Sequence, residues 1–186
     1  MSTLRWPLRR ARKAVWDGGV IAYPTEAVFG LGCDPLNAGA VAKLLAIKQR
    51  DAGKGFILIA ADIIQLDPFM DLPGKLREQL LKTWPGPVTW VVPAAPGVPD
   101  WLTGGRDTLA VRVTAHPVAR DLCAATGFAL TSTSANLSSH PPSRSALAVR
   151  RLLRNKLDYI LSGSVGPQRK PTEIRDALTG TLLRAS

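Results

Sequence analysis

Short apolar runs alternate with segments of helical periodicity along the whole chain. The runs predict strands at residues 20–23, 56–60, 88–92, 109–113 and 128–131, and a last strand pair near 158–161 and 172–184. Apolar residues that recur every three or four positions predict helices at residues 38–48, 73–83, 117–126 and 145–154. This alternation is typical of an α/β fold. Because several connections are too short for a helical crossover, we expect a mixed sheet rather than a doubly wound one.

The first residues predict an amphipathic helix. Leu8, Ala11 and Val15 fall on one face, Pro7 lies near the start, and Gly18 follows as a stop. Five cations at residues 5–13 resemble the start of a secretory signal, but residues 17–19 interrupt the apolar stretch that should follow. No apolar run approaches the roughly 20 residues of a membrane helix. We therefore expect a cytoplasmic protein without membrane contact, whose helix arginines form a solvated face or bind phosphate.

Length and composition set the class of protein. The chain has 186 residues, of which 46% are hydrophobic and 20% charged, which predicts one domain over residues 1–186 and excludes wholesale disorder. The net charge of +10 indicates an anionic partner. Cys33 and Cys123 fit no zinc spacing and no disulfide framework, so we expect reduced structural thiols.

The common nucleotide-binding motifs are absent from the sequence. No P-loop occurs, and Gly30-Leu31-Gly32 follows a predicted strand without the third glycine of a dinucleotide-binding turn. His116 and His140 each stand alone beside a proline, and no residue spacing indicates a metal site or a nucleophile with its base. Any chemistry must therefore come from other polar residues.

Cations gather behind the helix at residues 38–48. Lys48 occupies the next position on the apolar stripe of this helix, so it either snorkels at the helix end or points into an interior cavity. Arg50 and Lys54 follow just before the strand at 56–60. Three cations between a helix and a strand form a candidate clamp for phosphates or carboxylates.

The strand that contains Arg112 has two unlike faces. One face carries only large apolar residues, namely Leu109, Val111 and Val113. The opposite face carries Thr108, Ala110 and Arg112. This second face suits a pocket in which Ala110 leaves room and Arg112 meets a carboxylate; an ordinary solvent-facing side is the alternative.

Hydroxyl side chains follow two predicted strands. Residues 131–136 read Thr-Ser-Thr-Ser-Ala-Asn, a composition suited to an anion or ribose cradle, or to a capped turn. Thr25 and Glu26 follow Pro24 at the end of the strand at 20–23 and present a hydroxyl and a carboxylate.

Taken in order, these segments resemble the threonylcarbamoyl-AMP synthase family (TsaC/YrdC). The segments are Pro24-Thr25-Glu26-Ala27-Val28-Phe29-Gly30-Leu31-Gly32, Lys48-Gln49-Arg50, Thr108-Leu109-Ala110-Val111-Arg112 and Ser134-Ala135-Asn136. The resemblance runs from about residue 8 to the C-terminus and fits the short, single-domain bacterial form. It implies a YrdC-like α/β fold, a twisted mixed sheet curved around a large positively charged cavity.

The resemblance also implies the reaction and its partners. L-threonine, bicarbonate and ATP would give threonylcarbamoyl-adenylate and pyrophosphate, with Mg²⁺ accompanying ATP and no protein metal site. A threonylcarbamoyl-transferase complex would then modify adenosine 37 of tRNAs that read codons starting with A. Since most reactants are anionic, pocket cations that position them would suffice, without a covalent enzyme intermediate.

Site residues carry over by position. The residues expected at threonine are Thr25, Arg112, Ser132 and Thr172. Those expected at ATP are Lys48, Arg50, Lys54, Thr108, Ser134, Asn136 and Arg184. Lys48, Arg50 and Arg112 are the expected catalytic cations. Where many relatives have a proline and a histidine, this chain has Asp51 and Ile59.

Two other functions remain open. A non-catalytic module for double-stranded RNA or tRNA would explain the charge and the basic helices near residues 9–12 and 150–154. It would not explain an arginine beside Ala110 in a strand, and RNA contact is also compatible with an enzyme. A related carbamoyl-adenylate domain of hydrogenase-maturation carbamoyltransferases ranks lower, because those chains are longer and rich in cysteine.

Overall fold

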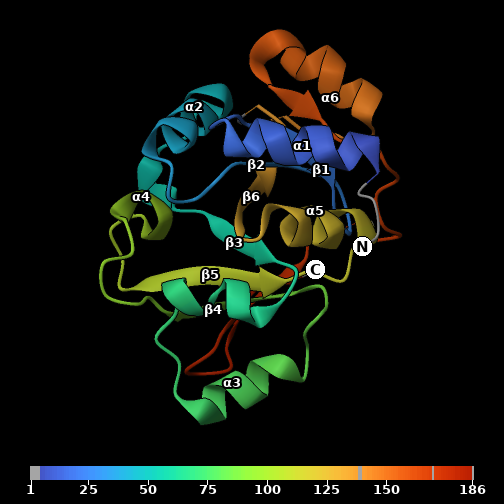
Figure 1. Cartoon of the computed structure of the whole chain (residues 1–186). Coiled ribbons are helices and arrows are strands. Elements are labelled where there is room, and N and C mark those ends of the chain that lie inside the picture. Colours follow the sequence, from blue (N-terminus) through green and yellow to red (C-terminus); the bar gives the residue numbers. More distant parts are fainter. Residues whose placement is uncertain (1–4, 138–139, 169, 186) are drawn as a thin grey trace.

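One mixed sheet organises the protein. The computed structural model describes residues 5–137, 140–168 and 170–185 (Figure 1), and in these residues nine strands form a sheet in the order β7-β1-β2-β6-β3-β5-β4-β8-β9. The strands are β1 (Ile21–Pro24), β2 (Phe29–Gly32), β3 (Ile57–Ala60), β4 (Val88–Pro93), β5 (Thr108–Val113), β6 (Leu130–Ser134), β7 (Tyr159–Ile160), β8 (Glu173–Asp176) and β9 (Leu182–Arg184). The pairs β1–β7, β3–β5 and β4–β8 are parallel and the other neighbours antiparallel, which confirms the α/β fold and the mixed sheet.

The helices also follow the predicted pattern. They are α1 (Trp6–Trp16), α2 (Ala38–Lys48), α3 (Gly74–Leu81), α4 (Asp100–Thr103), α5 (Pro117–Thr126) and α6 (Ala146–Leu153). Short 3₁₀ turns occur at Ala52–Lys54, Ile63–Gln65, Asp67–Phe69 and Arg154–Lys156. The sequence did not predict α4, because four residues are too few to show a helical period.

Two strand predictions need correction. Residues 172–184 form two antiparallel strands, β8 and β9, rather than one. The expected pairing of 158–161 with 172–184 is wrong, because β7 and β8 lie far apart in the sheet order. Asp158 holds the β7 end: its carboxylate accepts a hydrogen bond from the Val20 backbone at 2.7 Å and pairs with Lys43. The strand β2 was also missed, because Gly30 and Gly32 interrupt its apolar alternation.

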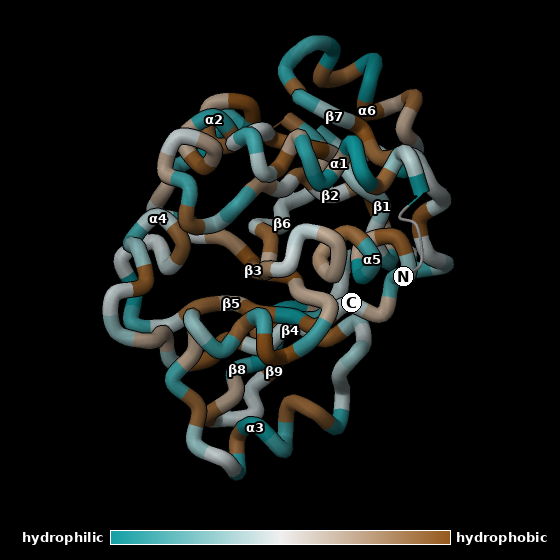
Figure 2. The backbone as a smooth tube through the Cα atoms, viewed as in Figure 1, coloured by the Kyte–Doolittle hydropathy of each residue, from teal (hydrophilic) through white to brown (hydrophobic). Residues whose placement is uncertain are grey.

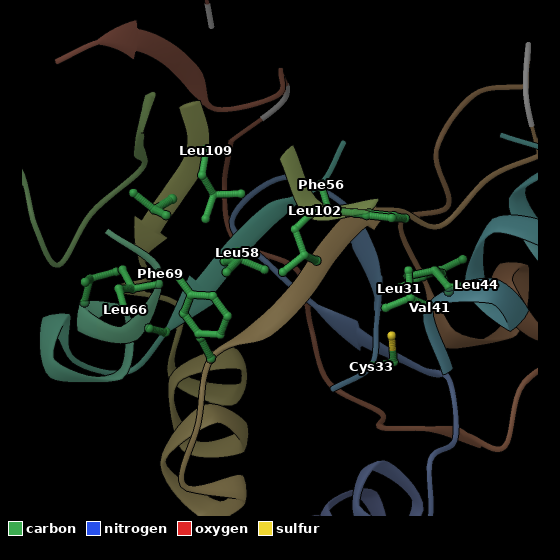
Figure 3. Packing of buried hydrophobic residues seen from close by; sticks show 14 of the residues in the cluster. Leu31, Cys33, Val41, Leu44, Phe56, Leu58, Leu66, Phe69, Leu102 and Leu109 are labelled. Carbon is green, nitrogen blue, oxygen red and sulfur yellow. The ribbon is translucent and has the colours of Figure 1, made fainter. Parts of the chain in front are cut away.

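One face of the sheet carries the larger core. The apolar face of β5 packs there, together with Leu31 of β2 and Leu58 of β3. Figure 3 shows Val41 and Leu44 of α2 pointing toward Leu31 and Cys33. Hydrophobic colour accordingly concentrates along β3 and β5 in Figure 2. This core fixes the strand alternation, so the opposite face of β5 is left for other chemistry.

The opposite face is divided between a small core and polar residues. Helices α1 and α5 lie side by side over one part of it (Figure 1), where Val15 and Leu122 pack with Tyr23, Ile59 and Leu130. The amphipathic helix predicted at the N-terminus is thus confirmed. Farther along the same face, β6 and β5 present Ser132 and Thr108 instead.

The two cysteines are buried and unpaired, as expected. Burial raises the pKa of Cys33 to about 11 and that of Cys123 to about 12, so both remain protonated thiols at neutral pH. In the residues that the structure describes, no helix has the length and apolar character to cross a membrane.

Gly32 lets β1, β2 and β6 pack closely. A Cβ atom at this position would lie 2.3 Å from the Thr131 carbonyl oxygen and 3.0 Å from the Tyr23 ring. At Gly30, two residues earlier, the nearest atoms would be 3.4 Å away.

We expect Gly32→Ala to lower the free energy of unfolding by about 1–3 kcal/mol in urea titrations, because the core must shift. Gly30→Ala is the matched control and should change it far less; equal losses would contradict the packing argument.

Candidate functional site

A cavity of about 350 Å³ opens on the polar part of the sheet. Its floor comes from the faces of β3, β5 and β6 that point away from the larger core. The following residues expected at the site line it: Thr25, Arg50, Lys54, Thr108, Arg112, Ser132, Ser134, Thr172 and Arg184. The cavity thus brings together residues that lie far apart in the chain, from Thr25 to Arg184.

Arg112 is a buried charge in the wall of this cavity. Its side chain lies on the same face of β5 as Ala110, and the residue is only 5% exposed. One guanidinium nitrogen, Nη2, lies 3.1 Å from Glu26 Oε2, and Nη1 donates a hydrogen bond of 2.8 Å to Thr172 Oγ1. The pocket interpretation of this strand face is therefore confirmed, and the solvent-facing alternative is wrong.

Glu26 is fixed from behind. Thr114 Oγ1 donates a 2.6 Å hydrogen bond to Glu26 Oε1, and the His116 backbone nitrogen donates to Thr114 Oγ1 at 3.1 Å. The His116 ring lies against the 162–168 loop, with Nε2 at 3.1 Å from the Ser164 carbonyl oxygen. His116 is thus a buried structural residue beside the site. Its sequence signal, one histidine next to a proline, was too weak to show this.

The remaining cavity cations face neutral oxygens. Arg50 donates to the Gly55 carbonyl at 3.0 Å, and Arg106 donates to the carbonyls of Gly53 and Lys54 at 3.0 and 3.2 Å. Arg184 donates to the Thr172 carbonyl at 2.7 Å. Burial lowers the pKa of Arg50 and of Arg184 from its ordinary value, and nearby Arg112 lowers that of Arg184 further. Because the backbone carbonyls that hold Arg50, Arg106 and Arg184 are neutral, the positive charge of these side chains is available to an anionic ligand.

Arg106 was missed by sequence reasoning. Its one signal was its place just before the strand that carries Thr108 and Arg112. Hydrogen bonds to the carbonyls of Gly53 and Lys54 position Arg106 at the cavity. These hydrogen bonds depend on tertiary contacts between α4 and the Ala52–Lys54 turn.

Lys48 cross-links two segments beneath the cavity. Its Nζ donates to the carbonyl oxygens of Ser134 and Asn136 at 2.6 and 2.8 Å and to Asn136 Oδ1 at 2.6 Å. The residue is 4% exposed, so the snorkelling interpretation is wrong: the turn after β6 encloses the amine. Burial and the nearby charge of Arg50 lower the pKa of Lys48 to about 8. Within the described chain, Lys48 and Asn136 hold the turn and do not line the cavity.

The hydroxyl-rich strand end divides between two roles. Thr131 Oγ1 accepts from the Cys33 backbone nitrogen at 2.9 Å on the core side. Ser132 and Ser134 line the cavity instead, and Ser134 Oγ donates to Asn136 Oδ1 at 2.7 Å. The segment is thus both a capped turn and one wall of the cavity.

Asp51 and Ile59 both have a structural role. Asp51 accepts a hydrogen bond from the Gly53 backbone at 2.9 Å and so caps the turn that carries Lys54. Ile59 is fully buried in the small core under α1 and α5.

Comparisons with known proteins place the whole chain in a family. The family model Sua5_yciO_yrdC, described as "Telomere recombination", matches residues 13–186. The threonylcarbamoyl-AMP synthase of Nitrosococcus oceani is 53% identical over 185 residues, which cover 99% of this chain and all of that protein. That of Pseudomonas aeruginosa is 51% identical over 175 residues, 94% of each chain.

A solved structure has the same fold and a bound amino acid. The crystal structure of P. abyssi Sua5 complexed with L-threonine matches with a TM-score of 0.89 and 32% identity, covering 96% of this chain and 54% of that one. This chain therefore spans about half of Sua5. Together with the two bacterial relatives and the cationic cavity, these matches show that the chain belongs to the threonylcarbamoyl-AMP synthase family.

Proposed function

We propose that this chain is an enzyme that makes threonylcarbamoyl-AMP from L-threonine, bicarbonate and ATP, with release of pyrophosphate. The observation that carries the proposal is one cavity that joins a buried arginine suited to a carboxylate with several cations that have no carboxylate partner among the described residues. The product would supply the threonylcarbamoyl group for adenosine 37 of tRNA through a transferase complex. The bacterial relatives, which match over nearly their whole length, support this assignment.

Threonine is assigned to the Arg112 end. There the guanidinium would pair with its carboxylate, a charge-assisted contact that is strongest when the donor is already held. Thr25, Ser132 and Thr172 line the same cavity and would contact the rest of the amino acid. The P. abyssi Sua5 complex, which contains L-threonine, supports a threonine site in this fold.

ATP is assigned to the cations of the cavity other than Arg112. Arg50, Lys54 and Arg184 would face its phosphates, with Thr108 and Ser134 on the same walls. Lys48 and Asn136 would act on ATP through the Ser134–Asn136 turn that they hold. Magnesium would enter as MgATP, because the oxygen atoms of a triphosphate are its preferred ligands. Among the described residues no group of three or more His, Cys, Asp or Glu side chains is placed to hold a metal ion.

The chemistry then needs two steps. The threonine amine attacks bicarbonate, forming an N–C bond and losing water, to give a carbamate. A carbamate oxygen attacks the α-phosphorus of ATP, and the bond from that phosphorus to the bridging oxygen breaks as pyrophosphate leaves. Cations held in advance at the phosphates stabilise the charge that develops in this second step. Positioning and charge, without a covalent enzyme intermediate, account for the residue types present.

The proposal also includes contact with tRNA and the cellular compartment of the reaction. Arg9, Arg10 and Arg12 lie on α1, whose Trp6 and Trp16 are both exposed, and Arg150 and Arg151 extend the basic surface on α6. Such a surface suits auxiliary contact with tRNA. We place the reaction in the cytoplasm and assign it to one domain over residues 1–186.

Pyrophosphate release tests the function directly. We expect release from ATP only when threonine and bicarbonate are both supplied, as measured by a coupled phosphate assay. Release without threonine would contradict the substrate assignment. No release in any mixture, with RNA retained on the protein, would favour a binding module instead.

Substitutions of Arg112 and of Arg50 should change different kinetic constants. Arg112→Ala should raise the KM for threonine, because loss of a charge-assisted contact typically costs on the order of 2–4 kcal/mol, or about 30- to 1000-fold. Arg50→Ala should instead lower kcat, since its cation favours the transition state. Circular dichroism checks that both variants are folded; unchanged rates in both would overturn the site assignment.

The lowered pKa of Lys48 predicts a pH dependence. Since this pKa is about 8, the amine loses its proton above that pH and with it a hydrogen bond to the turn. We expect the KM for ATP to rise above pH 8 in the native enzyme. Lys48→Met should have a high KM with no inflection between pH 7 and 9.5. An inflection near pH 8 that persists in this variant would assign it to another group.

A further inference from the structure

The cavity is unevenly compensated in charge. Five cationic side chains line it, namely Arg50, Lys54, Arg106, Arg112 and Arg184. Within the described part of the chain, only Arg112 has a carboxylate within ion-pair distance, that of Glu26. Arg50, Arg106 and Arg184 are held by backbone carbonyls, which orient a guanidinium without cancelling its charge. The cavity thus combines the Arg112–Glu26 ion pair with four cations whose charge no carboxylate of the described residues offsets.

Glu26 is well placed to control Arg112 without touching a ligand. It is 8% exposed and lies behind the cavity wall rather than in it. Its Oε1 is fixed by Thr114, while Oε2 lies 3.1 Å from Arg112 Nη2 in an ion pair and accepts no hydrogen bond in the described structure. Thr172 holds the guanidinium from the other side. Arg112 therefore cannot turn toward the phosphate end without leaving a buried carboxylate unpaired, which is unfavourable.

We propose that Glu26 is a specificity-determining positioning residue, which keeps the Arg112 end of the cavity selective for a zwitterionic amino acid over phosphate groups. This inference rests on the proposed function. An amino acid brings an ammonium group together with its carboxylate, so it adds almost no net charge beside the Glu26–Arg112 pair. A polyphosphate brings several negative charges next to Glu26 with no added cation, and repulsion in a half-buried site is strong.

The physical consequence is that phosphate groups and threonine bind at different cations of the cavity. ATP and pyrophosphate collect at the uncompensated cations, and the threonine position stays empty of phosphate. Without Glu26, Arg112 would become a fifth cation available to any polyanion, beside the four others that line the cavity, and triphosphate would compete with threonine. Specificity here comes from a built-in repulsion as well as from an attraction.

Competition binding on the native protein is the first test. Inorganic tripolyphosphate is titrated against L-threonine and against ATP, with isothermal calorimetry as the readout. We expect tripolyphosphate to compete with ATP and to leave threonine binding unchanged. Tripolyphosphate that competes with threonine in the native protein would overturn the inference and needs no variant to show it.

Two substitutions of Glu26 then separate charge from position. Glu26→Gln keeps an oxygen for Arg112 and removes the charge, so tripolyphosphate should now compete with threonine at least tenfold more strongly. Glu26→Ala also frees the guanidinium, so the KM for threonine should rise tenfold or more, and Gln should restore much of this loss. Equal losses in both variants, with no new competition, would leave only a structural role and would overturn the inference.

A matched control and a baseline keep the outcomes distinct. Asp158→Asn removes a carboxylate that pairs with Lys43 at 2.7 Å, outside the residues that line the cavity, and should create no competition with threonine. If the native protein neither binds threonine nor needs it for pyrophosphate release, the proposed function fails. If the native protein meets both conditions and Glu26→Gln behaves like it, only the inference about Glu26 fails.

Discussion

The ion pair between Arg112 and Glu26 is the interaction on which the site depends. It joins β5 to the turn after β1, and the hydrogen bond from Arg112 to Thr172 adds the segment before β8. These three segments lie far apart in the chain. A guanidinium suits this task because its donors form a rigid planar fork, so partners on two sides fix its orientation. The cavity is thus shaped around a charge that is already compensated.

The sheet explains why such a charge can be buried here. Apolar residues from every second position of β5 fill the larger core, and the alternation of the strand then turns Arg112 to the other face. On that face α1 and α5 cover only part of the sheet. The uncovered part has no helix to bury it, and polar side chains line it instead. A mixed sheet with helices unequally distributed therefore produces both a core and a cavity.

The charge of the whole protein has its local counterpart in this cavity. The net charge of +10 indicated an anionic partner but no position for it. The structure holds three of the cavity arginines with backbone carbonyls, which satisfy donors and leave charge in place. Lys48, which does not line the cavity, is also held by neutral acceptors: three oxygens from the Ser134–Asn136 turn surround its amine. Neutral acceptors thus position the cations without weakening their attraction for phosphate.

The sequence by itself determined the α/β class, the mixed sheet, most helices and the two faces of the strand at Arg112, because these follow from periodicities of two and 3.6 residues. Its motifs also identified the family, and nine of the residues predicted at the site line the cavity. It did not show β2, where glycines hide the alternation, or the position of the last strands, because pairing partners at long range leave no local pattern. Only the tertiary structure decided that Glu26 meets Arg112, that Arg106 joins the cavity, and that Lys48 holds a turn beneath it. Each of these contacts joins residues that are remote in the chain, and packing of the intervening elements brings them together.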